Sequence, residues 1–244
     1  EMIKNKNPIT GRKIRIAIVG CGRISKNHIN SILIHKNSAE LVALCDPINS
    51  NVKNALEIIK EKQLNESTIF CNPIIFNDYK DLLENIRLNK ICIDLIVLAT
   101  PSGLHASQVI SGAELGIHMC SEKPMATKWK DGKIMVEACK KANVNLFVVK
   151  QNRLNTTLQL LKKQIEQNKF GKIALVTINV FWQRPQSYYD QDKWRGTWDL
   201  DGGCLMNQAS HYVDLLEWLI GPIDCIDATI ATIGREIEVE DTAT

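Results

Sequence analysis

The sequence predicts an α/β fold: a doubly wound parallel sheet followed by a smaller α+β domain. In the first 150 residues, short apolar runs alternate with helical patterns, and after that point the alternation stops. Five runs are typical of buried parallel strands, because they are short, rich in β-branched residues and bounded by turn formers. These runs cover residues 15–20, 40–46, 94–100, 117–122 and 145–150.

The segments between these runs carry apolar residues at helical spacing, the pattern of βαβ crossovers that cover both faces of a sheet. They lie at 24–36, 51–62, 79–89, 104–116 and 129–142. We therefore expect a dinucleotide-binding type of domain over residues 1–150, which is close to the usual domain size.

The second domain, 151–244, is expected to be α+β with an open, mostly antiparallel sheet. Its elements would be a helix at 156–169, a long apolar strand at 172–183, a helix at 207–221 and two more strand-like runs. Because the last residues, EIEVEDTAT, resemble the middle of a strand, we expect this domain to be truncated at its C-terminus.

Composition excludes several classes of function. The 30 basic and 27 acidic residues are scattered, so no stripe of positive charge suggests a nucleic-acid partner. No apolar stretch has the length of a signal peptide or a membrane span. The 8 cysteines show no CxxC spacing, and most lie in apolar runs. We expect reduced thiols, no metal site and a cytoplasmic location.

The first chemical motif, GCGRIS, follows the first predicted strand. Gly20 and Gly22 would let the backbone turn tightly and approach a pyrophosphate at the N-terminus of the next helix. Asp46 ends the second strand, 24 residues after Gly22 (46 − 22), where a carboxylate binds ribose hydroxyls and favours NAD over NADP. The alternative is a tight turn whose Asp46 only caps a helix.

Two later strands also end in polar residues, at the edge where open α/β sheets bind ligands. Thr100 and Pro101 follow one strand, and Lys123 follows the next within SEKPMA. Burying an unpaired ammonium is costly, so a lysine at this edge suggests proton transfer to or from a hydroxyl or carbonyl oxygen. The alternative is a surface lysine that pairs with Glu122.

A second constellation lies in DGGCLMNQASHYVDLLEW, residues 201–218. Asn207, His211 and Asp214 are four and three residues apart, so they share one side of the predicted helix. The histidine could move a proton at neutral pH, and the asparagine could hold a hydroxyl or the imidazole. A structural histidine on an amphipathic helix is the alternative.

Together these motifs resemble the glucose-fructose oxidoreductase/inositol dehydrogenase/MocA (GFO/IDH/MocA) family, over nearly the whole chain. The resemblance implies an N-terminal Rossmann domain for the nicotinamide cofactor and a C-terminal domain that covers the substrate and builds dimers or tetramers. It implies that Lys123 and His211 form the catalytic pair. The implied cofactor-binding residues are Gly20, Gly22, Arg23, Ile24, Asp46, Thr100, Pro101, His105, Glu122, Lys123 and Gln151.

Longer strings, at 150–155, 181–203, 206–222 and 235–244, resemble the WlbA/WbpB subgroup of UDP-N-acetylglucosaminuronate 3-dehydrogenases. That resemblance implies NAD-dependent oxidation of a UDP-linked amino-sugar uronate in the biosynthesis of lipopolysaccharide O-antigen sugars, with a 2-oxo acid to reoxidise NADH. The implied substrate-binding residues are Lys123, Asn152, Arg153, Arg184, Tyr189, Trp194, Arg195, Asn207 and His211.

The chemistry of these side chains is compatible with such a substrate. Arginine forks suit a carboxylate or a pyrophosphate, and aromatic rings can stack on a sugar or on uracil. The aromatic residues, whose alternative role is a subunit interface, are Trp182, Tyr188, Tyr189, Trp194 and Trp198. Two other functions remain open: a family oxidoreductase acting on a free sugar or polyol, and a non-catalytic NAD-binding regulator.

The sequence departs from the broader family pattern at three points. Ser25 takes the place of a third glycine or alanine, and Asn207 stands where an aspartate is usual, which leaves proton transfer to Lys123 and His211. The third departure is the end of the chain at Thr244.

Overall fold

The computed structural model describes residues 9–65 and 71–244, which divide into two compact units. The first unit ends at Val148 and the second runs from Val149 to Thr244, and the predicted boundary after Lys150 lies two residues further along the chain. Residues 1–8 and 66–70 of the predicted N-terminal domain lie outside the described residues.

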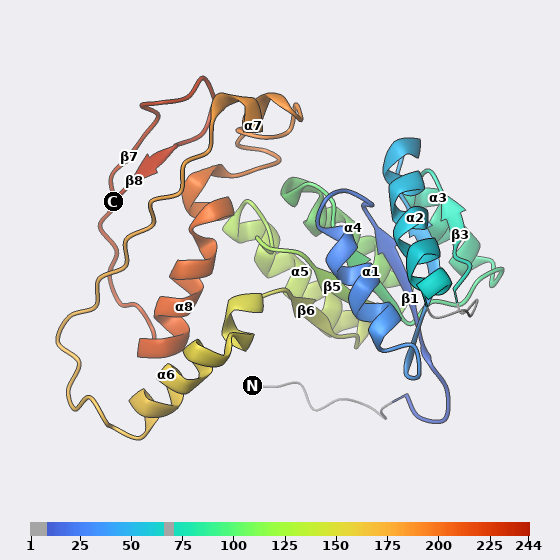
Figure 1. Ribbon diagram of the computed structural model, residues 1–244, viewed down its shortest axis with the longest axis horizontal. Helices are drawn as coiled ribbons and strands as arrows, with labels where there is room; N and C mark the ends of the chain where they lie inside the picture. The colour runs from blue at the N-terminus through green and yellow to red at the C-terminus, as the bar shows by residue number, and fades with distance from the viewer. Residues whose placement is uncertain (1–8, 66–70) are drawn as a thin grey trace. The chain divides into compact units, whose positions relative to one another are not determined.

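The first unit alternates strands with helices, as the hydrophobic pattern predicts (Figure 1). Its strands are β1 Ile14–Val19, β2 Ala39–Cys45, β3 Ile74–Phe76, β4 Leu95–Leu98, β5 His118–Ser121 and β6 Leu146–Val148. Its α-helices are α1 Ser25–Ile34, α2 Asn49–Asn65, α3 Tyr79–Arg87, α4 His105–Glu114 and α5 Trp129–Ala142, and a 3₁₀ turn, η1, spans Ser102–Leu104.

All six strands are parallel, in the order β3-β2-β1-β4-β5-β6. The predicted doubly wound sheet is thus confirmed, although the short strand β3 was not predicted. The strand order reverses between β1 and β4, which is the switch point where open α/β sheets bind ligands. Val19 lies opposite both Cys45 and Leu98, and Leu98 lies opposite Ser121, so four strands end at the same level.

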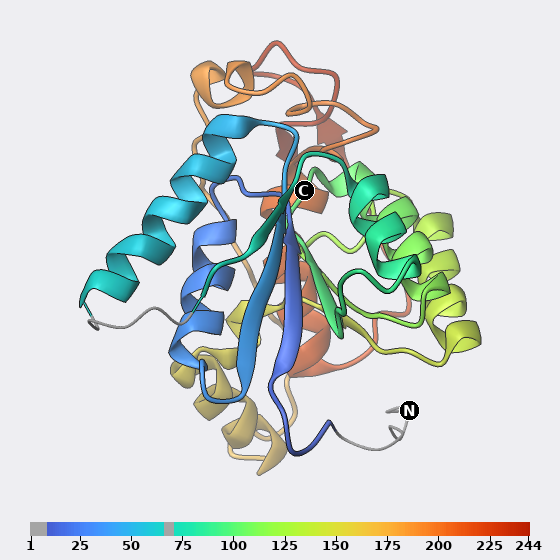
Figure 2. The same ribbon diagram turned by 90° about the vertical axis from the view of Figure 1, so that its right-hand side faces the viewer.

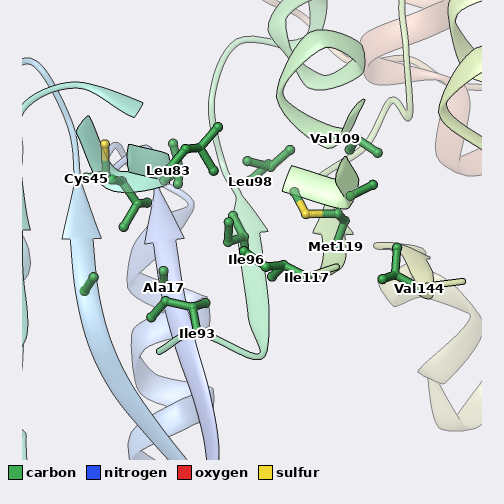
Figure 3. Packing of buried hydrophobic residues seen from close by; sticks show 14 of the residues in the cluster. Ala17, Cys45, Leu83, Ile93, Ile96, Leu98, Val109, Ile117, Met119 and Val144 are labelled. Carbon is green, nitrogen blue, oxygen red and sulfur yellow. The ribbon is translucent and has the colours of Figure 1, made fainter. Parts of the chain in front are cut away.

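Helices cover both faces of this sheet, with α1 and α2 on one side and α3, α4 and α5 on the other (Figure 2). Each face has its own core. Ile96, Leu98 and Met119 share the core drawn in Figure 3 with Val109 of α4. On the opposite face, strand residues such as Ile18 pack against α1 and α2. The strand ends are thereby fixed from both sides.

The second unit is an irregular α+β domain. Its elements are the 3₁₀ turn η2 Gln151–Leu154, α6 Thr156–Glu166, α7 Gln186–Asp190, the π-helical turn η3 Cys204–Gln208, α8 Ser210–Ile220, β7 Ile230–Ala231 and β8 Thr242–Ala243. β7 and β8 pair antiparallel, as the predicted class requires.

The predicted strand at 172–183 is wrong as a sheet element. The segment has strand-like composition, but in the described part of the chain no ladder of backbone hydrogen bonds joins it to β7 or β8. A strand is stabilised by pairing, and an apolar run by itself supplies no partner. Among the described residues, no helix combines the length and the apolar character needed to cross a bilayer.

Candidate functional site

The polar residues at the carboxyl ends of β1, β2, β4 and β5 form one cluster, because the strand register brings these ends to the same level. The first turn of the cluster joins β1 to α1. Gly20 has φ +90°, and a side-chain Cβ there would lie 2.5 Å from the Ala99 carbonyl oxygen. Only glycine fits at this point, because the β1 turn passes directly against the end of β4.

Gly22 has a different environment. A Cβ at this position would meet no protein atom within 4 Å, so the space beside the turn is open. Ser25, the departure from the dinucleotide fingerprint, is buried and donates its hydroxyl to the Gly22 carbonyl at 2.6 Å. The serine therefore closes the turn without filling the open space, and this space at the N-terminus of α1 fits a pyrophosphate. Arg23 and Ile24 are exposed on the same turn.

Asp46 holds two parts of the cluster together. The residue is only 5% exposed, and its carboxylate accepts the backbone N–H of Cys21 at 2.7 Å and that of Ile48 at 2.8 Å. The Asn51 amide lies 3.3 Å away. The bond to Ile48 lies just before α2, which begins at Asn49, and it accompanies a direct bond to the glycine turn. A carboxylate accepts about four hydrogen bonds, so capacity for ribose hydroxyls remains.

The loop after β4 is fixed by a buried histidine. His105 is 1% exposed; its Nδ1 lies 2.9 Å from the Pro124 carbonyl oxygen and its Nε2 lies 3.0 Å from that of Thr100. Burial lowers the pKa of His105, against the opposing effect of the two carbonyl groups. The hydroxyl of Thr100 donates to the Gln108 side chain at 2.6 Å. The predicted cofactor residue His105 thus contacts the protein backbone with both ring nitrogens.

The loop after β5 carries Glu122 and Lys123. Oε1 of Glu122 lies 2.8 Å from His28 Nε2, and Oε2 accepts the backbone N–H of Lys123 at 3.2 Å. Burial by itself would raise the pKa of Glu122, but the bond from His28 and the nearby Lys123 charge lower it overall. Glu122 is therefore held as a carboxylate. Lys123 itself is half-buried at the strand end, and its peptide bond to Pro124 is cis.

The second unit places the KQNR segment against α8. Arg153 donates Nε and Nη2 to the two oxygens of Asp214 at 2.8 and 2.7 Å, and Lys150 Nζ lies 3.5 Å from the same carboxylate. Burial would raise the pKa of Asp214, but these cations lower it overall. Arg153 is a predicted substrate contact, but its guanidinium group donates two hydrogen bonds to Asp214. Gln151 and Asn152 lie between Lys150 and Arg153 in the sequence, on the turn η2.

The remaining predicted arginines lie among aromatic rings. The Arg195 guanidinium lies 4.5 Å from the ring centres of both Tyr188 and Trp194, and it donates to the Tyr188 hydroxyl at 2.7 Å and to Asp192 at 2.9 Å. Arg184 lies 5.3 Å from the Trp182 and Tyr188 rings. Two of the five N–H donors of Arg195 are used in these bonds, so the fork keeps capacity for an anion. Tyr189 is buried beside Tyr188.

Arg184 and Tyr189 also line a groove of about 990 Å³ within this unit. Most of its other lining residues are apolar, among them Val180, Phe181 and Leu216. Such a lining offers few hydrogen bonds to a diphosphate, so the groove by itself does not identify the substrate site.

His211 is buried at the start of α8, after the π-helical turn. Two acids fix that turn. Asp201 accepts the Asn207 side-chain amide and the Gly196 N–H, and Glu240 accepts the Leu205 N–H at 3.0 Å. The predicted hydroxyl-binding group Asn207 is thus hydrogen-bonded to Asp201.

The structure therefore gathers the predicted cofactor residues of the first unit at one sheet edge. The predicted substrate residues of the second unit fall in three places: the Asp214 pair, the arginine and aromatic cluster, and the start of α8. Sequence reasoning missed His28, Asp201 and Glu240. His28 acts on a residue 94 positions away and Glu240 on one 35 positions away, so no local spacing pattern identified them. Asp201 contacts residues only five and six positions away, but these contacts lie in an irregular turn that has no helical or strand period.

Comparison with known proteins agrees with this geometry. Residues 14–150 match the model of an oxidoreductase family with an NAD-binding Rossmann fold, GFO/IDH/MocA, and residues 158–244 match the GFO/IDH/MocA C-terminal domain. D-apiose dehydrogenase of Paraburkholderia graminis is 24% identical over 96% of this chain and 57% of its own length.

Two solved structures are more similar. The WlbA dehydrogenase from Bordetella pertussis, in complex with NADH and UDP-GlcNAcA, is 53% identical, has a TM-score of 0.84, and is aligned over 97% of this chain and 63% of its own. The enzyme of the same name from Chromobacterium violaceum, with the same two ligands, is 48% identical, has a TM-score of 0.88, and is aligned over 99% of this chain and 65% of its own. The chain thus spans less than two thirds of these relatives.

Proposed function

Because the chain belongs to the GFO/IDH/MocA family of oxidoreductases, whose N-terminal domain is an NAD-binding Rossmann fold, we propose that it oxidises the 3-hydroxyl of UDP-N-acetylglucosaminuronate with NAD. The observation that carries the proposal is the 53% identity, along 97% of this chain, to a dehydrogenase solved with NADH and UDP-GlcNAcA. The strand-end cluster is consistent with it: an open space beside Gly22, a carboxylate at Asp46 and an amine at Lys123.

In this proposal, the turn at Gly20–Gly22 and the N-terminus of α1 hold the cofactor pyrophosphate, and Asp46 accepts the ribose hydroxyls. Thr100, Pro101 and Glu122 line the same edge, with Arg23, Ile24 and Gln151 as further contacts. When bound, NAD supplies the two-electron acceptor for the hydride. The presence of a carboxylate at position 46 disfavours the 2′-phosphate of NADP.

Lys123, in its neutral form, takes the proton of the sugar hydroxyl at Nζ while the C–H electron pair leaves with the hydride and the carbon becomes a ketone. His211 orients that hydroxyl. Arg184 and Arg195 supply guanidinium groups for the uronate carboxylate or the diphosphate, and the rings of Tyr189 and Trp194 support the sugar nucleotide. Asn152, Arg153 and Asn207 would support this site.

The wider biological role belongs to the same proposal: a step in O-antigen sugar biosynthesis, a homodimer or homotetramer, and reoxidation of NADH by a 2-oxo acid. We also propose that the protein acts in the cytoplasm. All eight cysteines are free, and four of them are buried, which suits a reducing compartment.

The test is the absorbance of reduced nicotinamide after the protein is mixed with NAD and UDP-N-acetylglucosaminuronate. We expect a rise with the uronate, none with UDP-N-acetylglucosamine, and a rate at least about 100-fold lower in Lys123→Ala, because general-base catalysis typically contributes that much. Exposed Lys130 on α5 provides the matched control, Lys130→Ala, with unchanged turnover.

A rise with D-apiose or another free sugar, but not with the nucleotide sugar, would instead support a free-sugar oxidoreductase like the relative from Paraburkholderia graminis. Tight NAD binding without turnover of any sugar would favour a non-catalytic cofactor-binding protein.

A further inference from the structure

We propose that His28 and His105 are positioning residues for Lys123, holding the residues on either side of it from opposite faces of the sheet. The proposal rests on the proposed function, since the role of Lys123 belongs to that function. Its starting point is that the neighbours of Lys123 in the sequence, Glu122 and Pro124, each contact a histidine from a different helix.

The first contact comes from α1. His28 Nε2 lies 2.8 Å from Glu122 Oε1, and the side chains are only 17% and 11% exposed. An ionised carboxylate can only accept, so the imidazole nitrogen must be the donor. The other carboxylate oxygen accepts the backbone N–H of Lys123 at 3.2 Å. A continuous chain of hydrogen bonds therefore runs from the helix after the glycine turn to the backbone of the lysine.

The second contact comes from α4. His105 Nδ1 lies 2.9 Å from the carbonyl oxygen of Pro124, and Nε2 lies 3.0 Å from that of Thr100. The ring thus links the residue after Lys123 to the end of β4. Because the histidine is 1% exposed, water does not compete for these carbonyl groups, and the ring has little freedom to move.

The two helices lie on opposite faces of the sheet. Ile29 and Ile32 of α1 belong to one core, and Val109 and Ala113 of α4 belong to the other. Figure 2 shows the two helices on either side of the sheet. The backbone at Lys123 therefore cannot shift toward either face without breaking one of the two contacts. Proton transfer demands such control, since a displacement of about 1 Å can cost about 100-fold in rate.

Conservative substitutions distinguish this role from simple packing. The amide nitrogen of glutamine can take the place of His Nε2, and that of asparagine the place of His Nδ1. His28→Gln keeps a donor for Glu122, while His28→Leu removes it. A neutral imidazole donates from one ring nitrogen only. His105→Asn places an amide nitrogen at the position of Nδ1, facing Pro124, while His105→Gln places one at the position of Nε2, facing Thr100.

We expect His28→Leu and His105→Gln to lower kcat for UDP-N-acetylglucosaminuronate by about 10- to 100-fold. KM for the sugar nucleotide and Kd for NADH should stay within about threefold, because the contacts act on the lysine backbone. His28→Gln and His105→Asn should recover most of kcat. His35→Gln, at an exposed histidine beyond the end of the same helix α1, is the matched control and should behave as wild type.

A double-mutant cycle makes the test specific. In a Lys123→Met background, adding His28→Leu should cost less than about twofold of the residual rate, because the group that it positions is gone. A loss by the same factor as in the wild-type background would overturn the proposal, as would wild-type kcat in both His28→Leu and His105→Gln. If the His105 variants do not fold, the two His28 variants and the cycle decide.

If the wild-type chain turns over no sugar nucleotide, the proposed function has failed, and the positioning role is then judged on the amine itself. The readout is the rate at which an amine-specific reagent labels Lys123, measured by mass spectrometry with exposed Lys130 as the internal reference. We expect at least a threefold change in His28→Leu and His105→Gln, and a rate near wild type in His28→Gln. Equal labelling in all variants would overturn the proposal.

Discussion

At the scale of single residues, two carboxylates of the first unit, Asp46 and Asp94, differ in how many hydrogen-bond donors they already accept. Asp46, at the ligand-binding edge, accepts the Cys21 and Ile48 N–H groups and keeps capacity for a ligand. Asp94 lies directly before β4, at the opposite end of the strands, and is saturated by two arginines. Its role is therefore stability, and it can be tested without touching the site.

Asp94 accepts both guanidinium groups and the Arg15 backbone N–H, at distances from 2.6 to 3.1 Å, and its side chain is 9% exposed. Burial by itself would raise its pKa, but the bonds from Arg12 and Arg15 hold the pKa far below the usual range. We expect Asp94→Asn to lower the free energy of unfolding at pH 7 by about 1–3 kcal/mol, the usual effect of losing charge-assisted hydrogen bonds. Turnover should not change.

The effect should depend on pH in a defined direction. Because the pKa in the folded state lies below the value of about 3.9 in the unfolded chain, the ionised carboxylate stabilises the fold at pH values above about 4. That contribution is lost as the pH falls toward the folded-state pKa. Urea unfolding at pH 7, 4 and 3 should show the gap between wild type and Asp94→Asn narrowing below pH 4. A gap that is constant or widens on acidification would contradict this account. Asp81→Asn, at an exposed acid, should stay within about 0.5 kcal/mol.

At the scale of elements, two glycines of the turn between β1 and α1 have different roles: Gly20 is needed for stability, and Gly22 leaves room for a ligand. Gly20 has φ +90° and presses against Ala99, so Gly20→Ala should cost at least about 1–3 kcal/mol and lower the midpoint of thermal unfolding. Gly22 faces open space. Gly22→Ala should therefore leave stability within about 0.5 kcal/mol while its methyl group obstructs the pyrophosphate.

We expect fluorescence titration to show NADH binding at least about tenfold weaker in Gly22→Ala, a loss of about 1.4 kcal/mol. Each variant serves as the control for the other, since both add one methyl group to the same turn. Wild-type NADH affinity in Gly22→Ala would contradict the placement of the pyrophosphate there.

The elements also show how far sequence reasoning reaches. Runs such as RIAIVG identify buried strands because a parallel sheet covered on both faces needs nearly continuous apolar residues. Positions at the ends of those strands, including Asp46 and Lys123, then follow from the geometry of the fold. The strand β3 was not predicted, because it has only three residues and two of them are exposed.

The sequence did not reveal which segments pair in the sheet or which side chains contact each other over long separations. The run at 172–183 has the composition of a strand, but pairing depends on segments elsewhere in the chain. The bond from Arg153 to Asp214 joins residues 61 positions apart, and that from His28 to Glu122 joins residues 94 apart. Side-chain contacts over such separations leave no periodic signal, so the arginine seemed available for a ligand.

At the scale of the whole molecule, the two units differ in how they are stabilised. Both hydrophobic cores of the parallel sheet consist of residues before Val149, so the first unit carries its own apolar stabilisation. The proposed cofactor contacts lie mainly in this unit, and the proposed sugar contacts mainly in the second. Ligands should therefore stabilise different parts of the chain.

Hydrogen exchange followed by mass spectrometry can test this division. At an NAD concentration 100 times Kd, mass action stabilises the unit that binds it by about 2.7 kcal/mol. Amides of β1 and β4 that exchange only through global opening of the first unit should then slow by about 100-fold. Peptides from α8 should change little with NAD alone and slow when UDP-N-acetylglucosaminuronate is added. Gly22→Ala, with its weakened cofactor binding, is the control and should show less protection at the same NAD concentration. Equal slowing of β1 and α8 peptides by NAD alone would mean that the two units open together, which would contradict the independent stability that we infer for the first unit from its cores.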